Sequence, residues 1–292
     1  MSEIIKVLPP EPRKALVALS MFRFLTPAQL VRLGITASEP VARNYVFARL
    51  EKRARPLCKS KKIGRFLPHV HYLTKHGAEE LAKVYRTSVD DFPYPIGAVQ
   101  FGEIFARHRF AQVDFHIGVR QWAHRRGDTS ILFADMDFDV TGSKRHGDFE
   151  ERSRIKFKGG GDFIIADGIF GVQIGDASLV YILEVHRNTE TARVARQIAK
   201  YIEIIRNREI MFKYRLNVSP VICSVHTKER VLKGTKAHLL NQPDFEAFKP
   251  AFLFNTSEQL DKDFTQGWHF ADEQPAYPFE PSSDPVEGPL VE

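Results

Sequence analysis

Apolar positions along the first quarter of the chain recur with the spacing of short helices. Residues 12–24, with the sequence PRKALVALSMFRF, predict a helix. A second helix is predicted from Pro27 to Gly34. Thr26 offers a capping hydroxyl, proline suits the first turn, and glycine commonly follows the end of a helix.

The next segments predict a longer helix and a β-hairpin. Ser38 can cap a helix over residues 39–53, whose apolar positions at helical spacing are Val41, Tyr45, Val46 and Leu50. Residues 58–74 predict two strands around a basic, glycine-containing tip, and Thr74 can cap a further helix over 75–85. Two short helices, a turn, a longer basic helix and a hairpin follow one another in the order of a winged helix.

Strands and helices alternate in the rest of the chain. A long amphipathic helix is predicted over 103–125, with an apolar stripe formed by Phe105, Phe110, Val113, Ile117 and Trp122. Residues 131–180 predict strands and irregular connections. Apolar, β-branched runs predict strands over 163–172, 178–186, 215–227 and 249–256, with helices after residue 186 and over 228–240. This alternation predicts an α/β domain with a mixed central sheet.

The composition of the connecting segments divides the chain into parts. Residues 1–90 form the predicted winged-helix domain, mostly α with a β-hairpin wing. A stretch rich in proline, glycine and aspartate predicts a linker over 91–100, and the α/β domain follows over 101–270. Residues 271–292 contain five prolines, six acidic residues and no Lys or Arg, so we expect a disordered or partner-binding tail.

Overall composition is that of a globular protein. The chain has 292 residues, of which 43% are hydrophobic and 27% charged, and this length favours about two domains. No apolar run is long enough to span a membrane, and the first residues do not have the pattern of a signal peptide. Cys58 and Cys223 are far apart in the sequence, which fits a reducing compartment. We therefore expect a cytoplasmic protein without a membrane segment.

Positive charge is concentrated in the first part of the chain. The net charge of the whole sequence is +6, but residues 1–90 carry 17 Lys or Arg against 7 Asp or Glu. A local basic excess on a helix and a hairpin favours binding to double-stranded DNA. The candidate contacts are Arg43, Asn44, Arg49, Lys52 and Arg53 on the helix and Lys59, Lys61, Lys62 and Arg65 on the hairpin. A solvated basic face or a protein-interaction module would share this pattern.

Candidate catalytic residues lie on two predicted strands and the helix that follows them. Asp167 is on the first strand, and Glu184 and His186 project to one face near the end of the second. Adjacent strands can bring Asp167 and Glu184 within reach of one cation, and carboxylate oxygens suit Mg²⁺ or Mn²⁺. Gln197 and Tyr201 share a face of the next helix, because they are four residues apart.

The ordered set of Asp167, Glu184-Val185-His186 and Gln197-x-x-x-Tyr201 resembles the core of PD-(D/E)xK nucleases. The chain over residues 12–225 resembles the replication-relaxation family, which includes the MOBC-type plasmid relaxases. The resemblance implies a restriction-nuclease-like α/β domain in which Asp167 and Glu184 are metal ligands, with Asp162 as a rival for Asp167. His186 stands in place of the nuclease lysine, and a third acid would be Glu103 or Asp114.

The resemblance also implies a function. We expect a relaxase-like endonuclease that nicks one DNA strand at a plasmid or mobile-element origin, together with relaxosome or coupling proteins. The alternative is a non-catalytic relaxosome accessory, replication or transcription regulatory protein with a degenerate nuclease fold, which the histidine at position 186 favours. The nucleophile is left open between water and a tyrosine such as Tyr45, Tyr72 or Tyr201.

Overall fold

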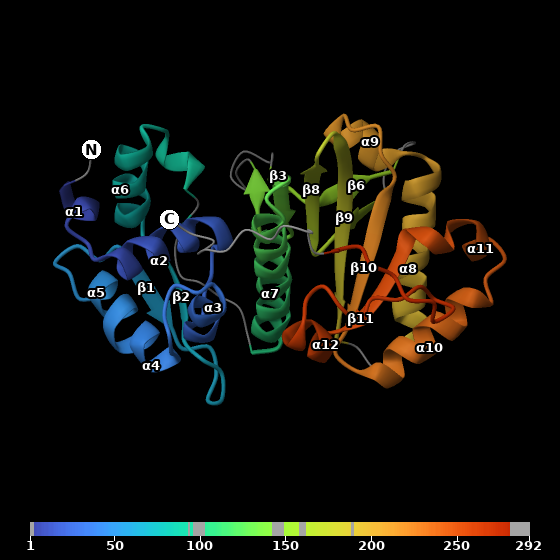
Figure 1. Cartoon of the computed structure of the whole chain (residues 1–292), viewed down its shortest axis with the longest axis horizontal. Coiled ribbons are helices and arrows are strands. Elements are labelled where there is room, and N and C mark those ends of the chain that lie inside the picture. The colour runs from blue at the N-terminus through green and yellow to red at the C-terminus, as the bar shows by residue number, and fades with distance from the viewer. Residues whose placement is uncertain are drawn as a thin grey trace. The chain divides into compact units, whose positions relative to one another are not determined.

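The computed structural model contains two compact units (Figure 1). It describes residues 3–92, 94–95, 103–141, 149–157, 162–187 and 190–280. The first unit takes in the described residues up to Ile117, and the second those from Gly118 onward. The division falls within one long helix, whereas the predicted boundary was a linker at 91–100, of which residues 93 and 96–100 lie outside the described part.

The first unit consists of helices and a small hairpin. In chain order its elements are α1 (Glu3–Lys6), α2 (Pro10–Phe22), α3 (Pro27–Arg32), the helical run α4 (Glu39–Val41), η1 (Ala42–Phe47) and α5 (Ala48–Glu51), strands β1 (Cys58–Lys61) and β2 (Val70–Leu73), α6 (Lys75–Tyr85), η2 (Val89–Asp91) and the first part of α7 (Glu103–Arg126). Thr26 caps α3 through a reciprocal capping box with Gln29, and Thr74 caps α6. Both caps were predicted from the sequence.

The hairpin packs closely on the helices that flank it. Strands β1 and β2 are antiparallel, with Cys58 opposite Leu73 and Ser60 opposite His71. The backbone of Leu25 exchanges two hydrogen bonds with that of His71. A Cβ at Gly77 of α6 would lie 2.1 Å from the carbonyl oxygen of Leu57, so only glycine allows this approach.

The longer helix differs from the regular α-helix that the sequence predicted. It runs from Glu39 to Glu51, and residues 42–47 form a π-helical stretch. Because a π-helical turn contains more residues than an α-helical turn, the inward face shifts along the sequence. Val41 and Tyr45, predicted to be buried, are 42% and 38% exposed. Val46 and Leu50 of the predicted stripe are buried, and Ala42 and Phe47 join them.

A five-stranded mixed sheet organises the second unit. Its order is β11 (Phe252–Thr256), β10 (Pro220–His226), β9 (Ala177–His186), β8 (Gly168–Ile174) and β3 (Thr129–Met136). The first three strands are parallel, and β8 and β3 continue the sheet antiparallel. Two small antiparallel pairs join β4 (Val140–Thr141) to β5 (Glu150–Glu151) and β6 (Arg154–Lys156) to β7 (Phe163–Ile165). The predicted strand 163–172 is thus two strands that separate at Ala166 and Asp167.

Helices cover both faces of this sheet. The parallel strands are joined through α8 (Thr191–Arg206) with α9 (Glu209–Tyr214), and through α10 (Glu229–Leu240) with α11 (Phe245–Phe248) and η3 (Lys249–Ala251). Since crossovers between parallel strands are right-handed, α8 and α10 pack side by side on one face. The core there includes Ile182, Ile198, Ile222, Leu232 and Phe252.

Aromatic side chains fill the opposite face. Trp122, from the second part of α7, packs edge-on against Tyr181 and Phe279. Phe264, after α12 (Ser257–Lys262), and Trp268 also contact Phe279. Of the predicted α7 stripe, Val113, Ile117 and Trp122 are buried, but Phe105 is 68% exposed because it lies in the first turn of the helix.

The structure differs from the prediction of a tail that is disordered from residue 271. Residues 271–280 pack on the second unit, where Ala271, Ala276 and Phe279 are buried. The hydroxyl of Tyr181 donates to the carbonyl of Pro278 at 2.8 Å, and the indole of Trp122 donates to that of Glu280 at 2.9 Å. The proline-rich composition predicted disorder. The burial of the Phe279 side chain stabilises residues 271–280 against the second unit despite that composition. Residues 281–292 lie outside the described part.

The architecture agrees with the fold class that the sequence predicted, at the level of its helices and strands. A mixed α/β architecture with a mixed sheet, preceded by helices with a small hairpin, was predicted and is confirmed. In the described part of the chain, every helix is too short or too polar to cross a lipid bilayer.

Candidate functional site

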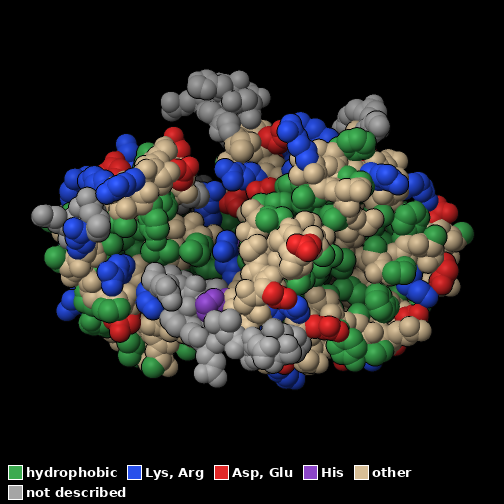
Figure 2. Space-filling view, turned by 45° about the horizontal axis from the view of Figure 1, so that its top comes forward, with side chains coloured by type: hydrophobic (Ala, Val, Ile, Leu, Met, Phe, Trp, Pro, Cys, Tyr) green, Lys and Arg blue, Asp and Glu red, His purple; other side chains and the backbone are tan. Residues whose placement is uncertain are grey.

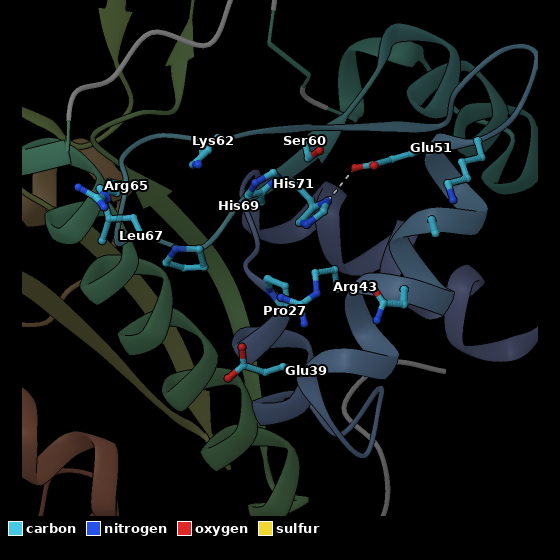
Figure 3. Close-up of a pocket in the computed structure, with 14 residues that line it drawn as sticks. Pro27, Glu39, Arg43, Glu51, Ser60, Lys62, Arg65, Leu67, His69 and His71 are labelled. Carbon is cyan, nitrogen blue, oxygen red and sulfur yellow. Dashed lines mark hydrogen bonds and ion pairs between the residues drawn. The ribbon is translucent and has the colours of Figure 1, made fainter.

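A basic groove in the first unit lies between the helix 39–51 and the hairpin. Its cavity of about 600 Å³ is lined by Arg43, Asn44 and Lys52 from the helix side and by Lys62 and Arg65 from the hairpin loop. Figure 3 shows Arg43 on the helix and Lys62 and Arg65 along the loop, on different sides of this space. All five side chains are exposed, so the four positive charges face solvent, and Glu39 and Glu51 line the same cavity. We call these five residues and their cavity the basic groove.

The remaining candidate DNA contacts lie outside the groove. Arg49 is exposed and stacks over the ring of Tyr45, with 5.1 Å between the guanidinium carbon and the ring centroid. Lys59 lines a separate cavity beside Arg55 and Lys75. Arg53 and Lys61 are half-buried. Figure 2 shows Lys and Arg side chains dispersed over the surface of the first unit, with apolar side chains between them.

Three acidic residues at one edge of the sheet form the second candidate site. Met136 pairs with Gly168, and Gly168 pairs with Leu183. One step beyond these pairs are Asp137, Asp167 and Glu184, which we call the carboxylate row. The amide of Asp137 donates to the carbonyl of Asp167 at 3.4 Å, and the Asp167 carboxylate accepts from the amide of Val185 at 2.6 Å. Because directly paired residues share a face of a sheet, the three side chains belong to the face that α8 covers.

Glu184 is the buried member of the row. It is 1% exposed, and its two oxygens accept hydrogen bonds from Gln197 Nε2, at 2.7 Å, and from the Tyr201 hydroxyl. Burial raises the pKa of Glu184 well above its usual value, and the negative charges of Asp167 and Asp137 act in the same direction. The structure therefore brings together four of the predicted residues, Asp167, Glu184, Gln197 and Tyr201.

Two histidines lie next to the carboxylate row on the same face of the sheet. His186 is buried on the same face, and its ring centroid lies 4.8 Å from that of His226 on the neighbouring strand β10. His226 Nε2 is 2.9 Å from the Ser224 hydroxyl. Burial lowers the pKa of His226 to about 2, and the charges of His186 and Lys236 contribute to the shift. His186 thus lies beside a buried imidazole.

The two predicted third acids are not seen in the carboxylate row. Asp114 lies in the first unit, where its Oδ1 accepts from Gln29 Nε2 at 3.0 Å and pairs with Arg32 at 3.1 Å. Glu103 begins α7, and its side chain lies outside the described part. Asp162, the rival for Asp167, is exposed and 3.9 Å from Lys200.

Asp137 is the member of the row that sequence reasoning missed. It belongs to the polar segment 134–154, which predicted a loop or a hairpin. The alternation of acids in that stretch was the available signal, because period-two spacing places side chains on one face of a strand. Asp135 lies on the row's face, where the hydroxyl of Tyr214 donates to it at 3.0 Å.

The donor atoms decide which cation each site suits. Carboxylate oxygens are the ligands that Mg²⁺ and Mn²⁺ prefer, so the chemistry of the row fits these ions. Among the described residues, one group of three has all its ligand atoms within 4.8 Å of one another, and it consists of Glu51, Cys58 and His71. The three carboxylates of the row do not meet this spacing.

Comparisons with protein-family models, with curated proteins and with solved structures find no match for this chain. The architecture alone does not identify a function either, because mixed α/β sheets support many chemistries. The function must therefore be argued from the basic groove and the carboxylate row.

Proposed function

We propose that this chain is a relaxase-like DNA-binding endonuclease that nicks one strand of a plasmid or mobile-element origin. The observation that carries the proposal is the carboxylate row, in which acids from the ends of three neighbouring strands meet under the Gln197 and Tyr201 face of α8. Three carboxylates at one edge of the sheet repel one another and so lower the stability of the fold. This cost favours a functional role for them over a purely structural one.

In this proposal the first unit is a winged helix that finds the site. The helix 39–51 would enter the major groove, with Arg43 and Asn44 near base edges or phosphates. Lys62 and Arg65, on the hairpin loop, would neutralise neighbouring phosphates. Relaxosome or coupling proteins would be the partners of such a protein at an origin.

The second unit would supply the cleavage chemistry. Asp167 and Glu184 would hold one Mg²⁺ or Mn²⁺, with Asp137 adding negative charge at the same edge. The bound ion would polarise the scissile phosphate and neutralise the charge that develops on it. Tyr201 and Gln197 orient the Glu184 carboxylate, and the amide of Val185 orients that of Asp167. His186 would hold or move a proton at the same face.

A nicking assay tests the proposal. The purified chain is incubated with supercoiled plasmid that carries the intergenic DNA next to its own gene, in Mg²⁺, Mn²⁺ or EDTA. Open circles that require the metal are expected. Asp167→Asn and Glu184→Gln should lower the nicking rate by about 100-fold or more while DNA binding persists, because removal of a group that stabilises the transition state typically costs that much. Asp176→Asn is the matched control, since Asp176 is an exposed acid in the turn between β8 and β9.

Two results would contradict the assigned site. One is nicking that persists in both Asp167→Asn and Glu184→Gln, and the other is an equal loss in Asp176→Asn. Circular dichroism of each variant separates a lost site from a lost fold.

A non-catalytic DNA-binding regulator is the second candidate. It is favoured by His186, which is buried where the resembling nucleases have a lysine, and by Glu184, whose two oxygens already accept hydrogen bonds. DNA that is shifted in a gel but uncut in every metal would support this candidate over the nuclease.

A further inference from the structure

A second cluster of ligating side chains lies in the first unit, away from the carboxylate row. It contains a carboxylate, a thiol and an imidazole, from Glu51, Cys58 and His71. Glu51 is the last residue of α5, Cys58 begins β1, and His71 lies on β2. Because Cys58 and Ser60 share the inward face of β1 and Ser60 is opposite His71, the thiol and the imidazole lie on the same face of the hairpin.

The three side chains are held in place before any ion arrives. The ring of His71 stacks on Phe47, with 3.5 Å between centroids and 1° between planes, and its backbone is bonded to Leu25. His71 Nδ1 is 2.9 Å from Glu51 Oε1, and Cys58 is completely buried. Among the described residues, His71 Nε2 is also buried and has no hydrogen-bond partner. The ring, which is 3% exposed, therefore has Glu51 as its side-chain partner at Nδ1, while its second nitrogen is left unsatisfied.

The donor set selects the kind of ion. Thiolate, imidazole and carboxylate groups are all common ligands of Zn²⁺. Mg²⁺, in contrast, prefers oxygen ligands and avoids sulfur. Tetrahedral zinc places neighbouring nitrogen and oxygen ligands about 3.3 Å apart, from bond lengths of about 2.0 Å. The Glu51–His71 pair at 2.9 Å would open only slightly to accept the ion.

The basic groove gives the ion a route in. Glu51, Ser60 and His71 line its cavity, and Figure 3 shows Glu51 and His71 joined across its upper side. The fourth tetrahedral position would face this cavity and take a water. The negative charges of a thiolate and a carboxylate balance the two positive charges of the ion, and a neutral imidazole adds none.

We propose that Glu51, Cys58 and His71 form a zinc site that joins the end of the helix 39–51 to both strands of the hairpin. The ion cross-links the two elements that carry the basic groove, so it fixes their relative orientation. This inference does not depend on DNA cleavage and stands or falls separately from the proposed function.

Cobalt substitution tests the site directly. The full chain is stripped with a chelator and titrated with Co²⁺, which takes zinc sites and reports its ligands by absorption. One equivalent should give the visible bands of tetrahedral Co²⁺ and a thiolate-to-cobalt charge-transfer band in the near ultraviolet, and Zn²⁺ should displace both. Zn²⁺ should also raise the melting temperature of the stripped chain, since a ligand that binds only the folded state stabilises it.

The chain supplies a matched control for the thiol. Cys58→Ser should abolish the charge-transfer band, whereas Cys223→Ser, which changes the other buried cysteine, should keep it. Glu51→Gln keeps the thiol and alters a side chain that is 28% exposed. Glu51→Gln should weaken Co²⁺ binding by more than about 10-fold. That is the lower end of the cost of losing a residue that only hydrogen-bonds to a metal ligand, and Glu51 would bind the ion directly.

Each result decides the proposal. A wild-type chain that shows no charge-transfer band with excess Co²⁺ overturns it, as does a band that survives in Cys58→Ser or disappears in Cys223→Ser. If Cys58→Ser does not fold, the Glu51→Gln titration replaces it, and unchanged affinity in that variant rejects the site.

Discussion

Glu184 and His226 are buried polar groups on one face of the sheet, and they meet the cost of burial differently. Glu184 accepts hydrogen bonds from Tyr201 and Gln197. His226 has one hydroxyl contact, to Ser224, and its Nδ1 has no hydrogen-bond partner among the described residues. A histidine in such a place stays neutral, because burial disfavours the charged imidazolium.

The burial of His226 makes stability depend on pH. Its folded pKa is lowered to about 2, whereas an unfolded histidine titrates near 6.5. The unfolded state therefore binds the proton first, so the contribution of His226 is complete above pH 6.5 and is lost as the pH falls. By pH 4.5 the free energy of unfolding should drop by roughly 2–3 kcal/mol from this group alone. His226→Gln should reduce that loss in urea unfolding at pH 7 and pH 4.5.

His238→Gln is the control for this measurement, because His238 is an exposed histidine in the last turn of α10. The same acid sensitivity in wild type and His226→Gln would show that other groups govern the loss.

Most of the residues around the carboxylate row could be predicted from the sequence, but Asp137 could not. Asp167, Glu184, Gln197 and Tyr201 could be predicted to lie together because strand and helix periodicities place them on facing sides over a short span of sequence. Asp137 could not, because its position follows from the pairing of β3 with β8, which are separated by residues 137–167. Glu51, Cys58 and His71 were also missed as a group, since no short motif spaces them.

At the scale of elements, two of the three predicted caps act through their side chains, whereas Ser38 precedes its helix without a side-chain capping hydrogen bond. Thr26 and Thr74 begin helices where the sequence predicted them, because a capping hydroxyl acts on its own neighbours. The π-helical stretch at 42–47 was not predictable from periodicity. Val46 and Phe47 within this stretch are completely buried, so the stretch belongs to the packed interior of the unit.

The segment 271–280 is an element whose role can be measured. Phe279 is fully buried among Trp122, Phe264 and Trp268, so truncation would leave a cavity between aromatic rings. Phe279→Ala should lower the free energy of unfolding by about 3–5 kcal/mol in a denaturant titration. Tyr277→Ala, at a neighbouring exposed aromatic residue, should change it by less than about 1 kcal/mol. Equal effects would mean that the segment is not part of the core.

Charge is distributed unevenly over the whole molecule. Residues 1–90 carry a net charge of +10, and the rest of the chain carries −4. The part of the first unit formed by residues 1–90 therefore attracts polyanions more strongly than the total of +6 indicates, and the attraction should weaken steeply with salt.

The salt dependence of DNA binding tests this arrangement. Binding to a duplex is measured by fluorescence anisotropy over a range of salt concentrations in wild type and in the double variant Arg43→Ala, Lys62→Ala. Loss of two phosphate contacts should reduce the slope of log affinity against log salt by about 1.8. Arg13→Ala, an exposed basic residue of α2 outside the basic groove, should leave the slope unchanged.

A slope that falls equally in Arg13→Ala would indicate diffuse attraction to the whole basic unit rather than docking in the groove. Absence of salt-sensitive binding in the wild type would instead favour a protein partner for the first unit.

The strand order of the second unit also sets the sequence of events while the chain is being synthesised. Strands β3, β8 and β9 are antiparallel neighbours and can pair once residue 186 has left the ribosome, but β10 and β11 must wait for complete crossovers. The first unit is built largely from local contacts and emerges earlier. If the proposed function holds, the DNA-binding unit of a nascent chain folds before α8 and β10 have packed around Glu184. The chain would then bind DNA before it can cleave DNA.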